Sequence, residues 1–172
     1  MTRELRVPRF LAALPAPVRW LAVPTALACT VVVLIGSWNS SADPAVDVPE
    51  PRGKAAESCR ALAGVLPQEL LGHARKDPSP ASPYVAVWSS SPRIVLRCGV
   101  PHPEGLVDEK QAEIAPTVND VTWWPEQLAD GGYRFTATQR AAFVEVTVPG
   151  GALANPLDAA AALSDAVRTT IP

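Results

Sequence analysis

The chain has 172 residues, a length typical of one domain, and its 15 basic and 17 acidic residues give a formal net charge of −2. The charge is unevenly spread, because the first 20 residues carry four arginines against Glu4 and the remainder is acidic on balance. A nucleic-acid binder needs a basic stripe to neutralise phosphates, and no such stripe occurs here. We therefore expect no nucleic-acid partner.

An uncharged apolar run extends from Trp20 to Trp38. Its nineteen residues would span roughly 28 Å as a helix, close to the ~30 Å hydrocarbon core of a bilayer. A tryptophan at each end suits the two membrane interfaces, and Pro24 is tolerated in a membrane helix. The run predicts a transmembrane helix over 20–38 that contacts membrane lipid and follows an N-terminal segment of residues 1–19.

The charges on the two sides of this run predict its orientation. Four arginines precede it, and Asp43, Asp47 and Glu50 follow it, so the N-terminus is expected in the cytoplasm and the body outside. Two alternatives are a signal peptide cleaved after Ala42 and a lipoprotein signal at Cys29. All three interpretations export the body. The transmembrane helix over 20–38 predicts a single-pass protein of the cell membrane.

The rest of the chain divides by composition into a linker over 39–56, rich in Ser, Pro, Asp and Ala, and an extracytoplasmic domain over 57–172. Hydrophobic periodicity then predicts elements in a fixed order. These are a helix over Lys54–Gly72 bent near Pro67, strands over Tyr84–Trp88, Arg93–Cys98, Val118–Trp124, Tyr133–Ala137 and Ala141–Val148, and a C-terminal helix opened by Asn155 and Pro156. Strands that follow one another over short connections favour an α+β domain, with an antiparallel sheet of about five strands flanked by the two helices.

Two cysteines lie in the body, Cys59 in the first predicted helix and Cys98 at the end of a predicted strand. Thiols of exported domains usually pair, so we predict a disulfide between them. The alternative is a reactive thiol at Cys98 with His102 as its base.

Other candidate chemistry is weak. The stretch His102, Glu104, Asp108 and Glu109 lacks a recognisable metal-ligand spacing, and no nucleotide-binding loop or hydrolase elbow is present. The sequence therefore predicts no catalytic residue, no metal and no cofactor, and it leaves an unrecognised hydrolase as an alternative.

Polar and aromatic residues on the strands are the candidate contacts with a ligand or partner. If their strands are neighbours, Arg97 and Glu145 form a cross-strand pair. A structural pairing is one interpretation, and an anion-binding site that uses Arg97 or Arg140 is the other. Alternation sends only one of Trp123 and Trp124 into the core, so Trp124 is a candidate contact for a partner or a sugar ring.

Several strings of this sequence together resemble one family. They are Cys59–Arg60–Ala61–Leu62 with Leu66–Pro67, Ala86–Val87–Trp88 through Pro92, Ile94–Val95–Leu96–Arg97–Cys98–Gly99–Val100–Pro101, Val118 to Trp123, Phe135 through Arg140, and Val144 to Pro149. This set is similar to the actinobacterial membrane-protein family called domain of unknown function 3515, over roughly residues 55–172. The chain departs from that pattern at Ser89–Ser90–Ser91, where a glycine is expected.

The resemblance implies a membrane-anchored envelope protein and supplies no activity. Three functions follow as hypotheses. The first is a non-catalytic module that binds an envelope protein partner, the second is a binding domain for a cell-wall or anionic small molecule, and the third is a hydrolase.

Overall fold

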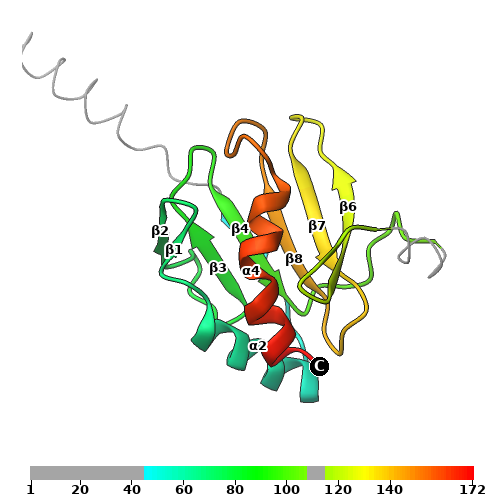
Figure 1. Ribbon diagram of the computed structural model, residues 1–172. Coiled ribbons are helices and arrows are strands. Elements are labelled where there is room, and N and C mark those ends of the chain that lie inside the picture. The colour runs from blue at the N-terminus through cyan, green and yellow to red at the C-terminus, as the bar shows by residue number, and fades with distance from the viewer. Residues whose placement is uncertain (1–44, 108–114) are drawn as a thin grey trace, which may run out of the picture. The chain divides into compact units, whose positions relative to one another are not determined.

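Alternating apolar and polar residues along the central strands build one antiparallel sheet in the computed structural model (Figure 1). The structure describes residues 45–107 and 115–172. The predicted segments 1–19 and 20–38, the start of the predicted linker, and Asp108 and Glu109 lie outside the described residues. Within the described ranges, no helix has the length and apolar character needed to cross a membrane.

The described chain forms eight strands in the order β1-β2-β3-β4-β8-β7-β6-β5, together with two helices. Their bounds are β1 Glu69–Leu70, β2 His73–Lys76, β3 Val85–Trp88, β4 Ile94–Cys98, β5 Thr117–Val118, β6 Val121–Gln127, β7 Tyr133–Ala137, β8 Val144–Val148, α2 Gly53–Val65 and α4 Leu157–Thr170. The predicted α+β class with an antiparallel sheet and flanking helices is confirmed. The predicted number of five strands is wrong.

Two tight hairpins account for the additional strands. The residues Leu71–Gly72 join β1 to β2 and have φ of 51° and 84°, while Asn119–Asp120 join β5 to β6 and have φ of 50° and 63°. Two-residue loops of this kind need positive φ at both positions. The strand predicted over Val118–Trp124 therefore contains a turn, and β6 continues past it through Pro125 to Gln127.

The first helix is shorter than predicted. It ends at Val65, and Leu66 is already extended, with φ −61° and ψ 139°. Pro67 explains this end, because the residue before a proline is forced out of the helical region. Gly72, predicted to stop the helix, instead supplies the second positive φ of the β1–β2 turn.

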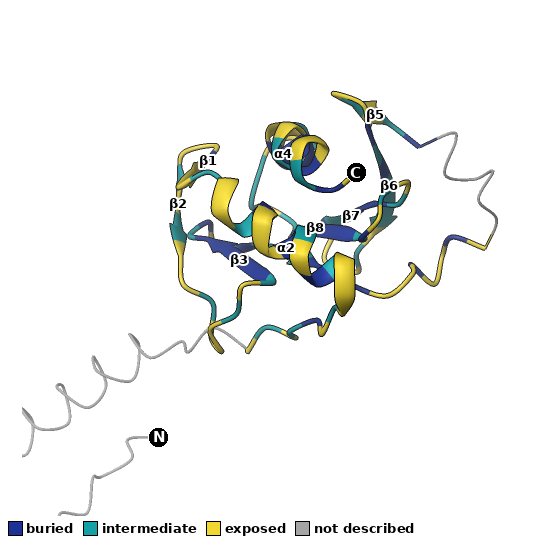
Figure 2. Ribbon diagram, turned by 90° about the horizontal axis from the view of Figure 1, so that it is seen from below, coloured by how far each residue is buried: buried dark blue, intermediate teal, exposed yellow. Residues whose placement is uncertain are grey.

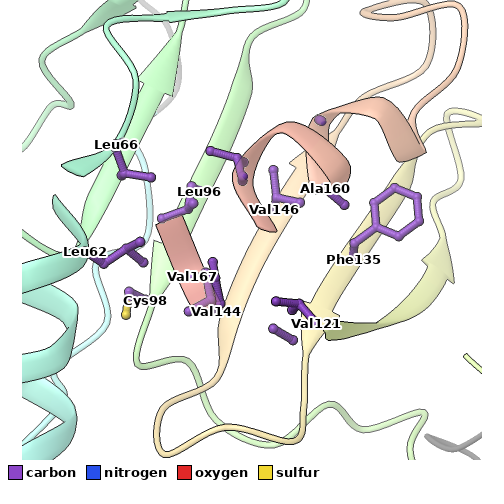
Figure 3. Packing of buried hydrophobic residues seen from close by; sticks show 14 of the residues in the cluster. Leu62, Leu66, Leu96, Cys98, Val121, Phe135, Val144, Val146, Ala160 and Val167 are labelled. Carbon is purple, nitrogen blue, oxygen red and sulfur yellow. The ribbon is translucent and has the colours of Figure 1, made fainter. Parts of the chain in front are cut away.

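The core lies between the sheet and α4, which crosses one face of the sheet in Figure 1 and lies above it in the edge-on view of Figure 2. Residues Val144, Val146 and Val148 of β8 are fully buried on this face, as their alternation predicts (Figure 3). Trp123 is also fully buried, and its indole Nε1 donates a 3.0 Å hydrogen bond to Ser164 Oγ of α4. The N-cap of α4 is Pro156 rather than Asn155, and Asn155 Oδ1, one residue earlier, accepts a 3.3 Å hydrogen bond from the Leu157 amide.

The other helix, α2, lies along one end of the strands, at the bottom of Figure 1, and packs against α4. The predicted disulfide between Cys59 of α2 and Cys98 of β4 is present, with a Cα–Cα distance of 5.6 Å. The helix begins inside the linker predicted over 39–56, and residues 45–52 before it are extended and reach the sheet, where Pro49 is buried. The disulfide therefore fastens the start of the domain to the middle of the sheet.

Removing this bridge should lower the free energy of unfolding by about 4 kcal/mol, the loop-closure entropy for cysteines 39 residues apart. The test is urea unfolding of the full chain with both Cys59→Ala and Cys98→Ala, next to the reduced wild-type chain. A loss below about 1 kcal/mol in both samples would contradict a structural role for the bridge.

Besides the disulfide, a pair of hydrogen bonds joins the β6–β7 turn to the loop after β8. The carboxylate of Asp130 accepts hydrogen bonds from the amides of Gly132, at 2.9 Å, and Gly150, at 3.2 Å. These two donors lower the pKa of Asp130 below its ordinary value, the Gly132 amide contributing most. The loops approach so closely that a Cβ on Gly132 would collide with the Val148 carbonyl and with Gly150.

Because the pKa of Asp130 is lower in the folded than in the unfolded chain, this group stabilises the fold above its unfolded pKa and loses that effect as the pH falls through its folded pKa. We expect acidification from about pH 5 to about pH 2 to destabilise the wild-type chain more than Asp130→Asn. The measurement is urea unfolding across this pH range. Parallel losses in the two chains would be the contradicting result.

Candidate functional site

The candidate site lies on the face of the sheet opposite α4. Register places Arg97 of β4, Glu145 of β8, Thr136 of β7 and Trp124 of β6 side by side in one row across four strands. Successive side chains of a strand point to opposite faces of the sheet. The apolar residues of these strands therefore face α4, and the residues between them put polar groups on the opposite face.

Glu145 is the centre of this row, and its side chain is only 8% exposed. Arg97 Nε donates to its Oε1 at 3.0 Å, and Arg97 Nη2 donates to its Oε2 at 3.2 Å, which confirms the predicted cross-strand pair. Thr147 Oγ1 donates to Oε1 at 3.3 Å, and Arg134 Nε lies 3.5 Å from Oε2. One buried carboxylate therefore binds the Arg97 guanidinium by two hydrogen bonds and lies within ion-pair distance of Arg134, whose Nε has no hydrogen-bond partner among the described residues.

Two further carboxylates flank this cluster. Asp47, in the extended segment before α2, forms a 2.7 Å ion pair with Arg97 Nη1 and is 88% exposed. Glu126 of β6 lies 4.0 Å from Arg134 Nη1. The charged groups thus alternate in sign along the face, from Asp47 through Arg97, Glu145 and Arg134 to Glu126.

A hollow of about 200 Å³ opens over the cluster. Its floor consists of strand residues, and its wall is the segment Val100–Glu104 that follows β4. The charged and polar residues that line it are Arg97, Glu104, Glu126, Arg134, Thr136 and Glu145. The hollow therefore presents both hydrogen-bond donors and acceptors to whatever enters it.

Thr136 is the most informative lining residue. It is 1% exposed, and its Oγ1 has no hydrogen-bond partner among the described residues. Buried hydroxyls are almost always paired, and an unpaired one costs about 1–3 kcal/mol. Since Thr136 lines the hollow, its hydroxyl is a polar group that a bound molecule would satisfy.

The structure brings some of the predicted contact residues together and separates others. Arg97 and Glu145 both line the hollow. Trp124 is half-buried beside it, and a Cβ built on Gly105 would lie 3.3 Å from Glu126 Oε1 and 3.8 Å from Trp124 Nε1, so the loop passes over both side chains. Trp123 occupies the core, as the alternation predicts for one of the two rings.

Arg140 is elsewhere in the molecule. Its guanidinium donates to the carbonyl oxygens of Ile171, at 3.3 Å, and Asp120. These contacts tie the end of the C-terminal helix to the β5–β6 turn. The predicted contact role of Arg140 has no support from the hollow.

Three lining residues were missed from the sequence: Arg134, Glu126 and Thr136. Arg134 and Thr136 flank the buried Phe135 in β7, and Glu126 lies two residues beyond Trp124 in β6, so the two-residue period of a strand is the signal that could have found them. Their relevance becomes visible only once β7 is known to pair with β8.

The alternative chemistry at the end of β4 can be assessed directly. The sulfur of Cys98 is in the disulfide, so the predicted alternative of a Cys98 nucleophile with His102 as base is wrong. The His102 ring packs edge-on against Phe143 with centroids 5.5 Å apart, and its Nδ1 is 3.0 Å from the Pro103 carbonyl oxygen. In the ranges 45–107 and 115–172, no three acidic, histidine or cysteine side chains gather as a metal site.

Comparison with known proteins matches the chain to the model of one protein family. The model of the family described as Protein of unknown function (DUF3515) matches residues 20–172, which is most of the chain and begins at the first residue of the apolar run. No curated protein and no solved structure matches significantly.

The Glu145 cluster predicts unequal effects for two substitutions that both remove a carboxylate from Arg97. Breaking a buried ion pair costs ~3–5 kcal/mol, and we expect about 2–3 kcal/mol for Glu145→Gln because Arg97 keeps some exposure. The matched control Asp47→Asn, at an exposed carboxylate, should cost less than ~1 kcal/mol. Urea unfolding measures both, and equal losses would show that Glu145 is not the centre of the cluster.

Proposed function

We propose that this chain, which belongs to the family Protein of unknown function (DUF3515), is a non-catalytic interaction module of the cell envelope. In this proposal a helix over residues 20–38 holds it in the membrane, and the domain binds an envelope protein on the outer side. The hollow over β4, β8 and β7 receives one side chain of that partner.

The proposed location rests on two features. The apolar run has the length of a bilayer crossing and is preceded by arginines. The domain also contains a disulfide, and disulfides persist in oxidising compartments outside the cytoplasm. These independent features favour the same side of the membrane for the domain.

The observation that carries the binding proposal is the unpaired, buried hydroxyl of Thr136 at the floor of a polar hollow. Folded proteins keep an unsatisfied buried group where function compensates for its cost. The ion pairs around Glu145 hold the neighbouring charged groups in fixed positions, so the hollow is preorganised for a partner group.

The size of the hollow favours a protein partner over a free small molecule. Sites for drug-sized ligands usually enclose ~300–1,000 Å³, whereas this hollow encloses about 200 Å³, enough for one side chain. Anchor residues that fill such pockets carry much of the energy of protein interfaces. The alternative of an anionic ligand loses support because Arg97 is hydrogen-bonded to Glu145 and Asp47, and because the lining carries three glutamates against two arginines.

A non-catalytic role is supported by the bonding of the side chains that could otherwise take part in catalysis. Cys98 is oxidised, and the arginines and Glu145 neutralise one another. Groups locked in mutual ion pairs act as fixed recognition elements more readily than as proton-transfer groups.

The proposal predicts that Thr136→Val weakens partner binding about tenfold, since the methyl group leaves the partner's polar group unpaired. The matched control is Thr138→Val, because Thr138 Oγ1 is also unpaired but lies outside the hollow. The measurement is photo-crosslinking of the full chain in native membranes, followed by quantitative mass spectrometry. A variant that keeps only residues 1–44 provides the background.

A partner that is enriched over this background, lost in Thr136→Val and retained in Thr138→Val supports the proposal. Equal recovery in the two valine variants, or no partner above the background, would contradict it.

A further inference from the structure

We infer that the partner group that enters the hollow is a primary ammonium group, the side chain of a lysine on the partner protein. This inference rests on the proposed function, because it specifies the chemistry of the same site. It is argued from the charges that line the hollow and from the unpaired hydroxyl at its floor.

The lining carries an excess of negative charge. Three carboxylates, from Glu104, Glu126 and Glu145, face two guanidinium groups, from Arg97 and Arg134. Asp47 lies against Arg97 from outside the hollow and adds a fourth carboxylate to the cluster. A cationic group entering here improves the charge balance, whereas an anionic group worsens it.

The Arg97 guanidinium is committed, Arg134 Nε lies 3.5 Å from Glu145 Oε2 without a hydrogen bond, and two of the negative groups are available. Both polar edges of Arg97 bind carboxylates, with Nε and Nη2 on Glu145 and Nη1 on Asp47. Glu126, by contrast, has only the 4.0 Å ion pair with Arg134, which is too long for a hydrogen bond, so its oxygens retain acceptor capacity. Glu104 is exposed on the wall and has no ion pair with any residue in the described ranges.

An ammonium group matches this set of acceptors. It has three donors and no acceptor, and it would find the Thr136 hydroxyl oxygen at the floor and carboxylate oxygens above it. The wall also includes Val100 and Pro101, against which the aliphatic stem of a lysine would pack. Thr136 thereby gains the partner that it lacks within the domain.

The test uses a zero-length carbodiimide crosslinker on the full chain in native membranes. Carbodiimide activates a carboxylate, and a lysine Nζ in contact with it displaces the leaving group as a urea, which forms an amide bond. We expect peptide mass spectrometry to find Glu126 or Glu104 linked to a lysine of the same partner that photo-crosslinking recovers. The combined variant Glu126→Gln and Glu104→Gln, which removes both acceptor carboxylates, should reduce the photo-crosslinked partner at least fivefold.

Two controls define the specificity of the link. Glu69→Gln removes an exposed carboxylate from β1, at the far edge of the sheet, and should leave the yield unchanged. In the photo-crosslinking assay, which does not consume amines, millimolar Nα-acetyl-lysine methylamide should reduce partner recovery, whereas the uncharged Nα-acetyl-norleucine methylamide should not.

The outcomes separate this inference from the proposed function. If Thr136→Val weakens partner recovery but no link from Glu126 or Glu104 to a lysine forms, the partner group is not an ammonium and the interaction module stands. Unchanged partner recovery by photo-crosslinking in the combined glutamine variant, or equal competition by both probes, also overturns the inference. If Thr136→Val leaves partner recovery unchanged, the proposed function itself is wrong.

Discussion

Glu145 lies on β8, between β4 and β7 in the middle of the sheet, and its buried carboxylate faces guanidinium groups from both neighbours. The core-facing side of this strand contributes Val144, Val146 and Val148, which are fully buried beneath α4. One strand therefore supports an apolar core on one face and a polar cluster on the other. A buried charge is tolerated only when it is paired, so the positions of Arg97 and Arg134 follow from the presence of Glu145.

This constraint also explains the character of the hollow. Arg97 is hydrogen-bonded to Glu145, and Arg134 lies within ion-pair distance of the same carboxylate, so both shape the floor. Glu126 and Glu104 retain free acceptor oxygens, and Thr136 retains an unpaired hydroxyl. This surface discriminates between partner side chains by their charge and by their hydrogen-bonding groups. That property is expected of an interaction module that binds one anchoring side chain of its partner.

Much of the central sheet could be predicted from the sequence because period-two alternation is strong in β4 and β8. The same alternation predicted the Arg97–Glu145 pair, given neighbouring strands. The short strands β1, β2 and β5 were missed because their hairpins depend on positive φ at Leu71, Asn119 and Asp120, which local hydrophobicity does not reveal. The hollow was only half predictable, since Arg134, Glu126 and Thr136 join it through the order of strands rather than through any motif.

The central claim is that Glu145 holds the Arg97 guanidinium in place, and the Nε–H signal of Arg97 tests it most directly. In an ¹H–¹⁵N spectrum of the full chain, the account predicts a slowly exchanging, hydrogen-bonded Nε–H for Arg97 that collapses to rapid exchange in Glu145→Gln. An averaged, rapidly exchanging Arg97 Nε–H in the wild-type chain, unchanged by Glu145→Gln, would contradict it.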